Sequence, residues 1–340
     1  DQINMTDSIP EHLVRVQPDQ LNITRKKWGR GYRYYNGGEM PLEDEGKLEV
    51  VSSIPVPATW SEVHLCPDPQ SYILASGYDG SGKFQYLYHP DYLDFRNKLK
   101  FEELHHFGEA LPRIRRKVRA DLKAKEWTEE KLMALLVRVL DKYHLRIGSR
   151  VYAQKNQSFG LTTLRKKHLK EEDSDMYFQY QGKSGQLREV HLTDSRLVDL
   201  IHEVAEFPGW ELFSFRQGNA SVSASSTKVN HYIQDISQSD FTARTFRTWA
   251  GTVLAVKYYP KAKDELKANP RRDLKAILVE KVAEKLGNTP AVCRDYYIHP
   301  GVLEKVVSGN FDPNPCDQQF LKNNLYRKYE CRTMEILSGL

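Results

Sequence analysis

The chain has 340 residues, of which 40% are hydrophobic and 28% are charged, as is typical of a soluble protein with about two domains. The best candidate for a membrane helix, Met133–Leu140, is interrupted by Arg138 and is far shorter than the ~18 residues required. No basic-then-apolar leader opens the sequence, so we do not expect secretion. These features predict a cytoplasmic protein.

Charge is distributed unevenly along the chain, whose formal net charge is +5. Residues 1–95 contain 8 Lys and Arg against 14 Asp and Glu, a net charge of −6. The remaining residues contain 42 and 31 respectively, a net charge of +11. This imbalance is typical of a protein whose C-terminal part binds a polyanion.

Four cysteines are scattered through the chain, at positions 66, 293, 316 and 331. No two of them form a CxxC pair, and none has a histidine at the spacing of a zinc site. We therefore interpret them as reduced thiols and expect no bound metal.

The sequence of the N-terminal part predicts a short leader followed by a small domain. We expect residues 1–23 to be a loose leader and residues 24–95 to form a mostly β domain. Three runs of β-forming residues, Ser61–Leu65, Tyr72–Ser76 and Phe84–Tyr88, are separated by turns that contain proline or glycine. We interpret each run as a strand.

Residues 96–340 predict a larger, mostly α domain. The segment Arg113–Lys125 contains seven basic residues, a pattern that fits either a solvated helix face or a helix that faces DNA. Thr128 can cap the next helix, which has glutamates in its first turn. We expect this helix to end near Gly148, which would place Arg146 at its C-terminal edge.

One β-hairpin is predicted within this α domain. Residues Met176–Gln181 and Gln186–Leu192 alternate as strands do, and the four residues between them form a glycine-flanked turn with Lys183 at its tip. Further helices are predicted at Asp194–Glu206, Ser226–Ile236, Ala243–Tyr258 and from Asn269-Pro270 to Gly287.

A tyrosine near the C-terminus has a setting that suggests catalysis. Thr289 and Pro290 can open a helix, and Tyr297 lies nine residues after the polar amide of Asn288. A phenol has a pKa of ~10, so it is a poor nucleophile unless cations or a base assist it. Packing in a core is the alternative role. Neighbouring helical residues point about 100° apart, so only one of Tyr296 and Tyr297 can face a substrate.

Three basic residues upstream complete a possible site for breaking a phosphodiester. Arg146 and Arg247 lie in apolar-rich motifs, although a surface salt bridge is the commoner role of an arginine. They can stabilise charge on the non-bridging oxygens of the transition state. Lys183 can protonate the leaving oxygen, since the proton of a lysine can be moved. Asn288 can donate to a non-bridging oxygen, or it can be a plain helix cap.

The sequence around Lys183 also resembles the end of a nucleotide-binding P-loop. Such a loop needs a glycine five residues before Gly182, and that position is Tyr177. The P-loop interpretation therefore fails, and no ATP site is expected.

Taken together, ordered motifs from Ile54 to Glu304 resemble those of the compact bacterial and viral type IB DNA topoisomerases. The motifs include LRIGSRVYA, SFGLTTLRKKH, FQYQGKSG, FRTWAGT and LGNTPAVCRDYY. The resemblance implies an α+β protein, with a small mostly-β domain and a larger α-rich catalytic domain that form a clamp around duplex DNA. It also implies relaxation of positive and negative supercoils by a monomer, without ATP or metal, at the nucleoid.

The same resemblance assigns roles to individual residues. Tyr297 would attack a DNA phosphate and become linked to its 3′ end, and Lys183 would act as general acid toward the 5′ oxygen. Arg146 and Arg247 would stabilise the transition state. Asn288 takes a position where many relatives have histidine, so we expect a weaker pH dependence from it.

The resemblance also points to residues that contact DNA. Gln85, Tyr86 and Tyr88 form the QYxY element that touches DNA in the family, and we expect the basic run at residues 165–167 to contribute as well. That run consists of Arg165, Lys166 and Lys167. The family often has asparagine where this chain has Ser149.

Two other functions remain open. A tyrosine site-specific recombinase shares this chemistry, but it usually has histidine three residues before the second arginine, where this chain has Arg244. A DNA-binding protein with a decayed site is the second alternative, and it would bind duplex DNA without forming a covalent adduct.

Overall fold

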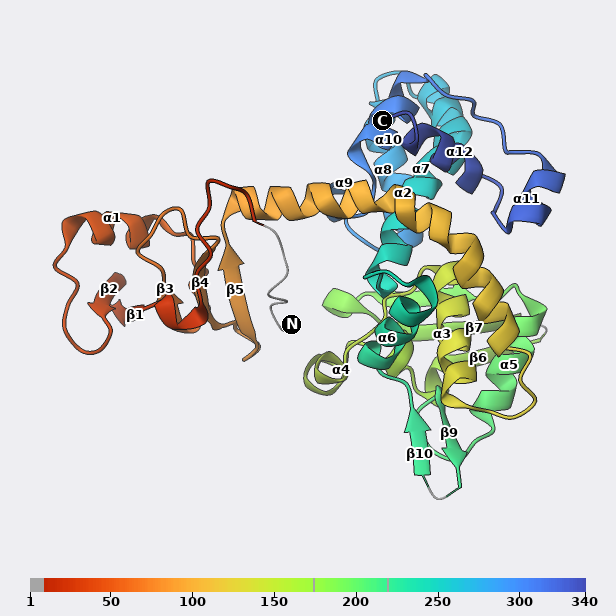
Figure 1. Cartoon of the computed structure of the whole chain (residues 1–340), viewed down its shortest axis with the longest axis horizontal. Coiled ribbons are helices and arrows are strands. Elements are labelled where there is room, and N and C mark those ends of the chain that lie inside the picture. The colour runs from red at the N-terminus through yellow and green to blue at the C-terminus, as the bar shows by residue number, and fades with distance from the viewer. Residues whose placement is uncertain (1–8, 174, 219) are drawn as a thin grey trace. The chain divides into compact units, whose positions relative to one another are not determined.

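The computed structural model describes residues 9–173, 175–218 and 220–340 and divides the chain into two compact units (Figure 1). The first unit ends at Lys100 and the second begins at Phe101. This division falls within α2, a helix of 32 residues (Pro90–Asp121). The first unit is mostly β and the second is rich in helices, so the predicted α+β fold class is confirmed.

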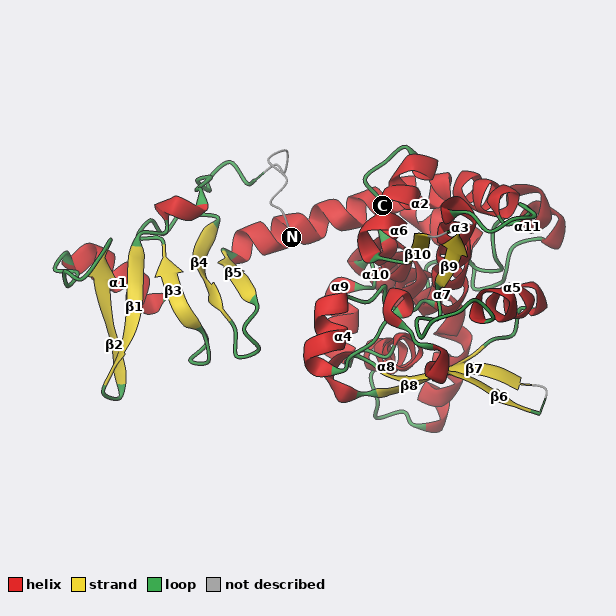
Figure 2. Ribbon diagram, turned by 90° about the horizontal axis from the view of Figure 1, so that it is seen from below, coloured by secondary structure: helices red, strands yellow, loops and turns green. Residues whose placement is uncertain are grey.

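The first unit contains a five-stranded antiparallel sheet with the strand order β2-β1-β3-β4-β5 (Figure 2). Its strands are β1 (Ile23–Trp28), β2 (Gly31–Asn36), β3 (Ser61–Leu65), β4 (Ile73–Tyr78) and β5 (Phe84–Tyr88). The prediction of β3, β4 and β5 is confirmed, with β4 displaced by one or two residues. The hairpin of β1 and β2 was not predicted. Helix α1 (Glu45–Ser53) follows β2, and the Asp44 side chain caps it.

The predicted leader differs from what the structure describes. Residues 1–8 lie outside the described residues, but Leu13, Val16 and Leu21 are buried in a cluster with Tyr72. The backbone of Val14 also bonds to Gln70 and Tyr72. From residue 9 onward this segment is therefore an integral part of the first unit, because its apolar side chains pack with residues of β4 and β5.

The second unit is built around α3 (Glu129–Tyr143), most of whose side chains are buried. The other helices of this unit are α4 (Arg150–Asn156), α5 (Ser195–Ala205), α6 (Ser226–Ser237), α7 (Ala243–Ala268), α8 (Leu274–Leu286), α9 (Pro290–Tyr296), α10 (Pro300–Ser308), α11 (Gln318–Asn324) and α12 (Glu330–Leu337). Its strands are β6 (Leu169–Glu172), β7 (Asp175–Gln181), β8 (Leu187–His191), β9 (Ser214–Gln217) and β10 (Ala220–Ser223). None of the helices in the described ranges has the length and apolar character needed to cross a membrane.

Helix α3 begins where it was predicted and ends earlier. The Thr128 side chain accepts a hydrogen bond from the Lys131 amide (3.2 Å), which confirms the predicted cap. The expected end near Gly148 is wrong, because His144 adopts a left-handed conformation (φ 58°) and stops the helix. Arg146 consequently lies in the loop after α3.

The region between α7 and α8 also differs from the prediction. Asn269 ends α7, since its amide bonds back to carbonyls of that helix, and it does not begin α8. The side chain of Asp273 caps α8 instead, by accepting a hydrogen bond from the Ala276 amide (2.8 Å). Helix α8 ends at Gly287 as predicted, with φ 63° at that glycine.

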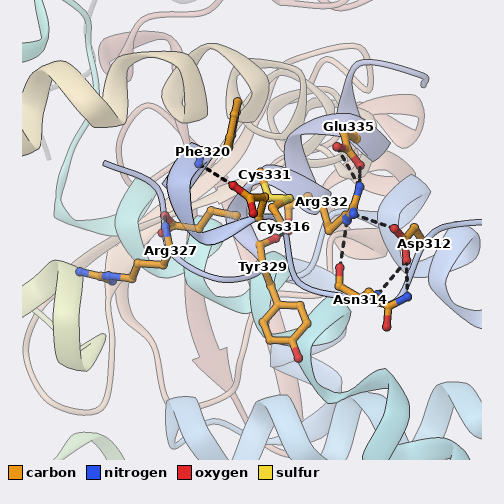
Figure 3. The surroundings of a disulfide bond; sticks show 12 residues. Asp312, Asn314, Cys316, Phe320, Arg327, Tyr329, Cys331, Arg332 and Glu335 are labelled. Carbon is orange, nitrogen blue, oxygen red and sulfur yellow. Dashed lines mark hydrogen bonds and ion pairs between the residues drawn. A yellow bond between two sulfur atoms is a disulfide. The ribbon is translucent and has the colours of Figure 1, made fainter. Parts of the chain in front are cut away.

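Two of the four cysteines form a disulfide, which corrects the expectation of reduced thiols throughout. Cys316 and Cys331 are bonded, with their Cα atoms 6.4 Å apart (Figure 3). Cys66 and Cys293 are free and buried. The pairing was not evident from the sequence because the bond joins residues on either side of α11, with no recognisable motif.

Candidate active site

Arg247 lies on α7 and is 4% exposed. Its guanidinium donates hydrogen bonds to the carbonyl of His144 and to that of Leu286 (3.0 Å). It also donates to Oδ1 of Asn288 (3.3 Å). Burial lowers the pKa of Arg247, and the neighbouring Tyr297 phenol opposes this effect. Because an arginine stays protonated in proteins, these contacts hold a fixed positive charge inside the unit.

Arg146 approaches the same amide from the loop after α3. Its guanidinium donates to the carbonyl of Gly287 (2.8 Å) and to Oδ1 of Asn288. The loop is held by Gly148 and Gly160, which pack so closely that a Cβ at Gly160 would lie 2.5 Å from the Gly148 Cα. Gly148 also has φ 93°, which disfavours any other residue. These two glycines therefore fix the backbone that carries Arg146.

Tyr297 follows α9 directly and is half-buried. Thr289 caps this helix and Pro290 is its first residue, as the sequence predicts. The Arg247 guanidinium carbon lies 5.1 Å from the centroid of the Tyr297 ring. The adjacent Tyr296 is 47% exposed. Of the two tyrosines, Tyr297 is thus the one that the structure packs beside an arginine of the site.

Two buried donors of the site have no hydrogen-bond partner in the part of the chain that the structure describes. They are Nδ2 of Asn288 and Nε of Arg247. Leaving a buried polar group unpaired is costly, so native proteins do so rarely. An anion is the kind of group that accepts from such donors, and Arg146 would add a further positive charge. The arrangement is therefore suited to a phosphate.

Two site residues were missed by sequence reasoning, namely Arg188 on β8 and Tyr180 on β7. They are opposite each other in the hairpin register. Arg188 packs on Gly287, where a Cβ would lie 1.9 Å from the arginine Nη1. Burial raises the pKa of Tyr180, whereas Arg188, Arg247 and Arg146 lower it. The only available signal was the alternation of β8, which puts Arg188 and Val190 on one face.

Lys183 lies in the predicted turn between β7 and β8 and is exposed. It makes no hydrogen bond or ion pair with any residue that the structure describes. The structure therefore brings Arg146, Arg247, Asn288 and Tyr297 together, while Lys183 is connected to them only through its hairpin, whose strand β8 carries Arg188.

The candidate DNA-contacting residues of the first unit lie on β5. The Gln85 side chain donates to Asp79 (2.7 Å), so its position is fixed by the β4–β5 turn. Tyr86 and Tyr88 are partly buried against the same apolar cluster. Burial, with Tyr92 close by, raises the pKa of Tyr88 to about 12.

The three basic candidates of the second unit differ from one another. The Arg165 guanidinium lies over the rings of Phe159 (5.3 Å) and Trp210 (4.8 Å), and its Nε is buried without a partner in the described ranges. Lys166 donates to the carbonyl of Phe207, whereas Lys167 is exposed.

One group of side chains on α2 has the residue types of metal ligands. His105, His106 and Glu109 have ligand atoms within 4.8 Å of one another and are the one such group found among the described residues. His105 also contacts the hydroxyl of Ser338 (2.9 Å). None of the three bonds to a candidate catalytic residue, so this group adds nothing to the site.

Two family models match parts of this chain. Residues 92–310, more than half of the chain, match the family described as eukaryotic DNA topoisomerase I, catalytic core. Residues 31–79 match the N-terminal domain of bacterial DNA topoisomerase IB. The DNA topoisomerase 1B of Acanthamoeba polyphaga mimivirus is 28% identical over 298 residues, covering 83% of this chain and 86% of the relative.

Poxvirus proteins are more distant relatives. The DNA topoisomerase 1B of vaccinia virus (strain Western Reserve) and the DNA topoisomerase I of monkeypox virus are each 21% identical over 276 residues. Each alignment covers 79% of this chain and 85% of the relative. The chain belongs to the compact type IB DNA topoisomerases. It is accordingly an isomerase whose substrate is DNA.

Proposed function

We propose that this topoisomerase relaxes positive and negative supercoils by cleaving one DNA strand through a 3′-phosphotyrosyl intermediate. The Oη atom of Tyr297 gives up its proton to solvent and attacks the phosphorus, and the bond to the 5′ oxygen breaks as that oxygen is protonated. The new phosphotyrosyl bond keeps the energy of the phosphodiester. The free 5′ end then rotates about the intact strand, and its hydroxyl attacks the phosphotyrosine to restore the DNA.

The cations and the amide of the site stabilise the transition state. Arg146, Arg247 and the Nδ2 of Asn288 donate to the non-bridging oxygens, where negative charge increases as the nucleophile attacks. The observation that carries this proposal is the pair of buried donors without partners in the described ranges, one on Arg247, which lies beside Tyr297, and one on Asn288, which is bonded to Arg247. The side chains that carry these donors are held by hydrogen bonds to His144, Leu286 and Arg146, so they need little reorganisation when the phosphate arrives.

Lys183 acts as the general acid. It protonates the 5′ oxygen as this group leaves and recovers the proton during religation. Lys183 is exposed on a glycine-flanked turn, so its ammonium group is accessible to bound DNA.

Duplex DNA is contacted by both units. Gln85, Tyr86 and Tyr88 contribute from β5, and the basic run at residues 165–167 contributes from the second unit. These contacts are mainly to phosphates, so binding weakens steeply with added salt. We also propose that the protein clamps duplex DNA and acts as a monomer. We place this activity at the nucleoid in the cytoplasm.

Relaxation of a supercoiled plasmid in EDTA, with no nucleotide added, tests this function. The proposal predicts full relaxation of both positively and negatively supercoiled plasmids that carry no special site. A site-specific recombinase would leave such plasmids unchanged, and a non-catalytic DNA-binding protein would bind them without relaxing them. Either result would refute the proposal.

A further inference from the structure

The C-terminal segment, residues 311–340, lies beyond the 92–310 range that matches the catalytic core. It contains α11, α12 and the disulfide between Cys316 and Cys331 (Figure 3). The disulfide links the start of the segment to α12, directly beside Glu330. Residues 316–331 therefore form a covalently closed loop, and the buried acid Glu330 is next to the second cysteine of that loop.

Glu330 is 3% exposed and accepts four hydrogen bonds. Arg115 donates to both carboxylate oxygens (2.7 Å each). The Trp249 indole (3.2 Å) and the Arg327 backbone amide (2.6 Å) donate as well. Burial alone would raise the pKa of Glu330, but Arg115 lowers it. A buried, fully bonded carboxylate has little freedom to move.

Arg115 extends this contact to α3. It donates from Nε and Nη2 to the two carboxylate oxygens of Asp141 (3.0 and 2.8 Å). Arg327 also donates to Asp141 (2.6 Å). Arg115 and Asp141 are buried, so the network of these residues with Glu330 forms a continuous charged bridge between α12, α2 and α3.

The charged bridge ends near the two arginines of the site, at Asp141 on α3 and at Trp249 on α7. Asp141 lies on the last turn of α3, three residues before His144, whose carbonyl accepts a hydrogen bond from Arg247. Trp249, which donates to Glu330, lies on α7 two residues after Arg247. Arg146 follows in the same loop as His144. Glu330 thus bonds directly to α7 through Trp249 and is linked to the end of α3 through Arg115 and Asp141.

We propose that Glu330 is a positioning residue for strand cleavage, which holds Arg146 and Arg247 in register with each other through Arg115 and Trp249. The inference rests on the proposed cleavage chemistry and assigns to the C-terminal segment a part in that chemistry. Glu330 itself does not touch the phosphate. Its effect is on the placement of the two guanidinium groups, and small misplacements of catalytic groups reduce rates strongly.

The substitution Glu330→Gln tests this role with little change in shape. It removes the negative charge and presents an amide donor to Arg115, so the ion pair between Arg115 and residue 330 is lost. A matched control is Glu335→Gln, on the same helix, where the carboxylate pairs with Arg332 (2.7 Å) at the surface. Glu330→Asp is a third variant, which keeps the charge on a shorter side chain.

Single-turnover cleavage of a short duplex, with DNA affinity and melting temperature, is measured for each variant. The duplex is short enough on the 5′ side for the released fragment to dissociate, which prevents religation. The amplitude then reports the folded fraction and the rate constant reports positioning. We expect Glu330→Gln to lower the rate constant by about 10- to 100-fold with DNA affinity within about twofold of wild type. Glu330→Asp should recover part of this loss, and Glu335→Gln should match wild type.

A Glu330→Gln protein with reduced amplitude or melting temperature but a wild-type rate constant would overturn the inference, since Glu330 would then serve folding alone. Failure of the proposed function would give a different result: the wild-type protein itself would form no covalent adduct with DNA. Measurements well below the lowest melting temperature keep the two outcomes distinct.

Discussion

A Cβ atom at Gly251 would lie 2.3 Å from the carbonyl oxygen of Tyr297. This contact is possible only because α7 has no side chain at that position, and it brings the end of α9 against the helix that carries Arg247. The glycine of the FRTWAGT motif therefore sets the distance between the proposed nucleophile and its neighbouring cation.

Substitution Gly251→Ala should displace Tyr297 and impair cleavage. We expect cleavage to slow by about 100-fold and the free energy of unfolding to fall by about 1–3 kcal/mol, because the added methyl group overpacks a helix contact. Single-turnover cleavage and denaturant unfolding measure the two effects. The control is Gly46→Ala on α1, where the nearest atom would lie at an ordinary 3.5 Å. Equal cleavage by both variants would contradict this account.

Asn288 should be needed as a donor more than as an acceptor. In Asn288→Asp the carboxylate still accepts from Arg146 and Arg247, but it cannot donate to a phosphate and repels it. We expect cleavage to fall by about 10²–10³, as for loss of one preorganised donor, without loss of melting temperature. Asn269→Asp, at the exposed end of α7, is the control. A cleavage rate near that of wild type would argue against a phosphate at this amide.

We expect Lys183 to have a single role in cleavage, which is to protonate the 5′ oxygen as it leaves. We expect Lys183→Ala to slow cleavage of normal DNA by about 10²–10⁴. A substrate with sulfur in place of the 5′ bridging oxygen should restore most of the rate, because a thiolate leaves without a proton. Arg146→Ala should gain no such recovery. If both variants respond equally to the sulfur substrate, the general acid is another group.

His144 should make stability depend on pH. Burial, with Arg327 close by, lowers its pKa to about 3, whereas an unfolded histidine has a pKa of 6.5. Between these values the unfolded state binds more protons, so this residue's contribution is present above pH 6.5 and is lost as pH falls. The expected loss approaches about 1.4 kcal/mol per pH unit below 6.

Denaturant unfolding between pH 7 and 4.5 measures this loss, and His144→Asn supplies the comparison. Asparagine tolerates the left-handed conformation of this position (φ 58°) and does not titrate. The variant should therefore lose less stability than wild type over the same range. An identical pH dependence would show that the buried imidazole is not responsible.

Much of the fold followed from local patterns, and the exceptions have physical causes. Thr128 marked the start of α3 because an N-cap is a local interaction. The end of that helix was missed because His144 takes a conformation that is usually reserved for glycine. Asn269 was mistaken for a helix start because the true cap, Asp273, lies after a proline that suggested an earlier beginning.

The site was predictable only where the chemistry lies in short motifs. Arg146, Arg247 and Tyr297 each stand in a recognisable sequence context. Arg188 lies at the site because the register of β7 and β8 places it opposite Tyr180. Glu330 acts through Arg115, Asp141 and Trp249, which are far apart in the chain. Contacts of that kind depend on tertiary packing, which local sequence patterns do not encode.

The most direct test of the account is to identify which tyrosine becomes linked to DNA. Adduct formed in EDTA is trapped with denaturant and digested, and the peptide that carries the 3′ nucleotide is sequenced by mass spectrometry. The account predicts linkage at Tyr297, an adduct that persists in Tyr296→Phe, and none in Tyr297→Phe although this variant binds DNA. Linkage at Tyr296, or adduct formation by Tyr297→Phe, would contradict it.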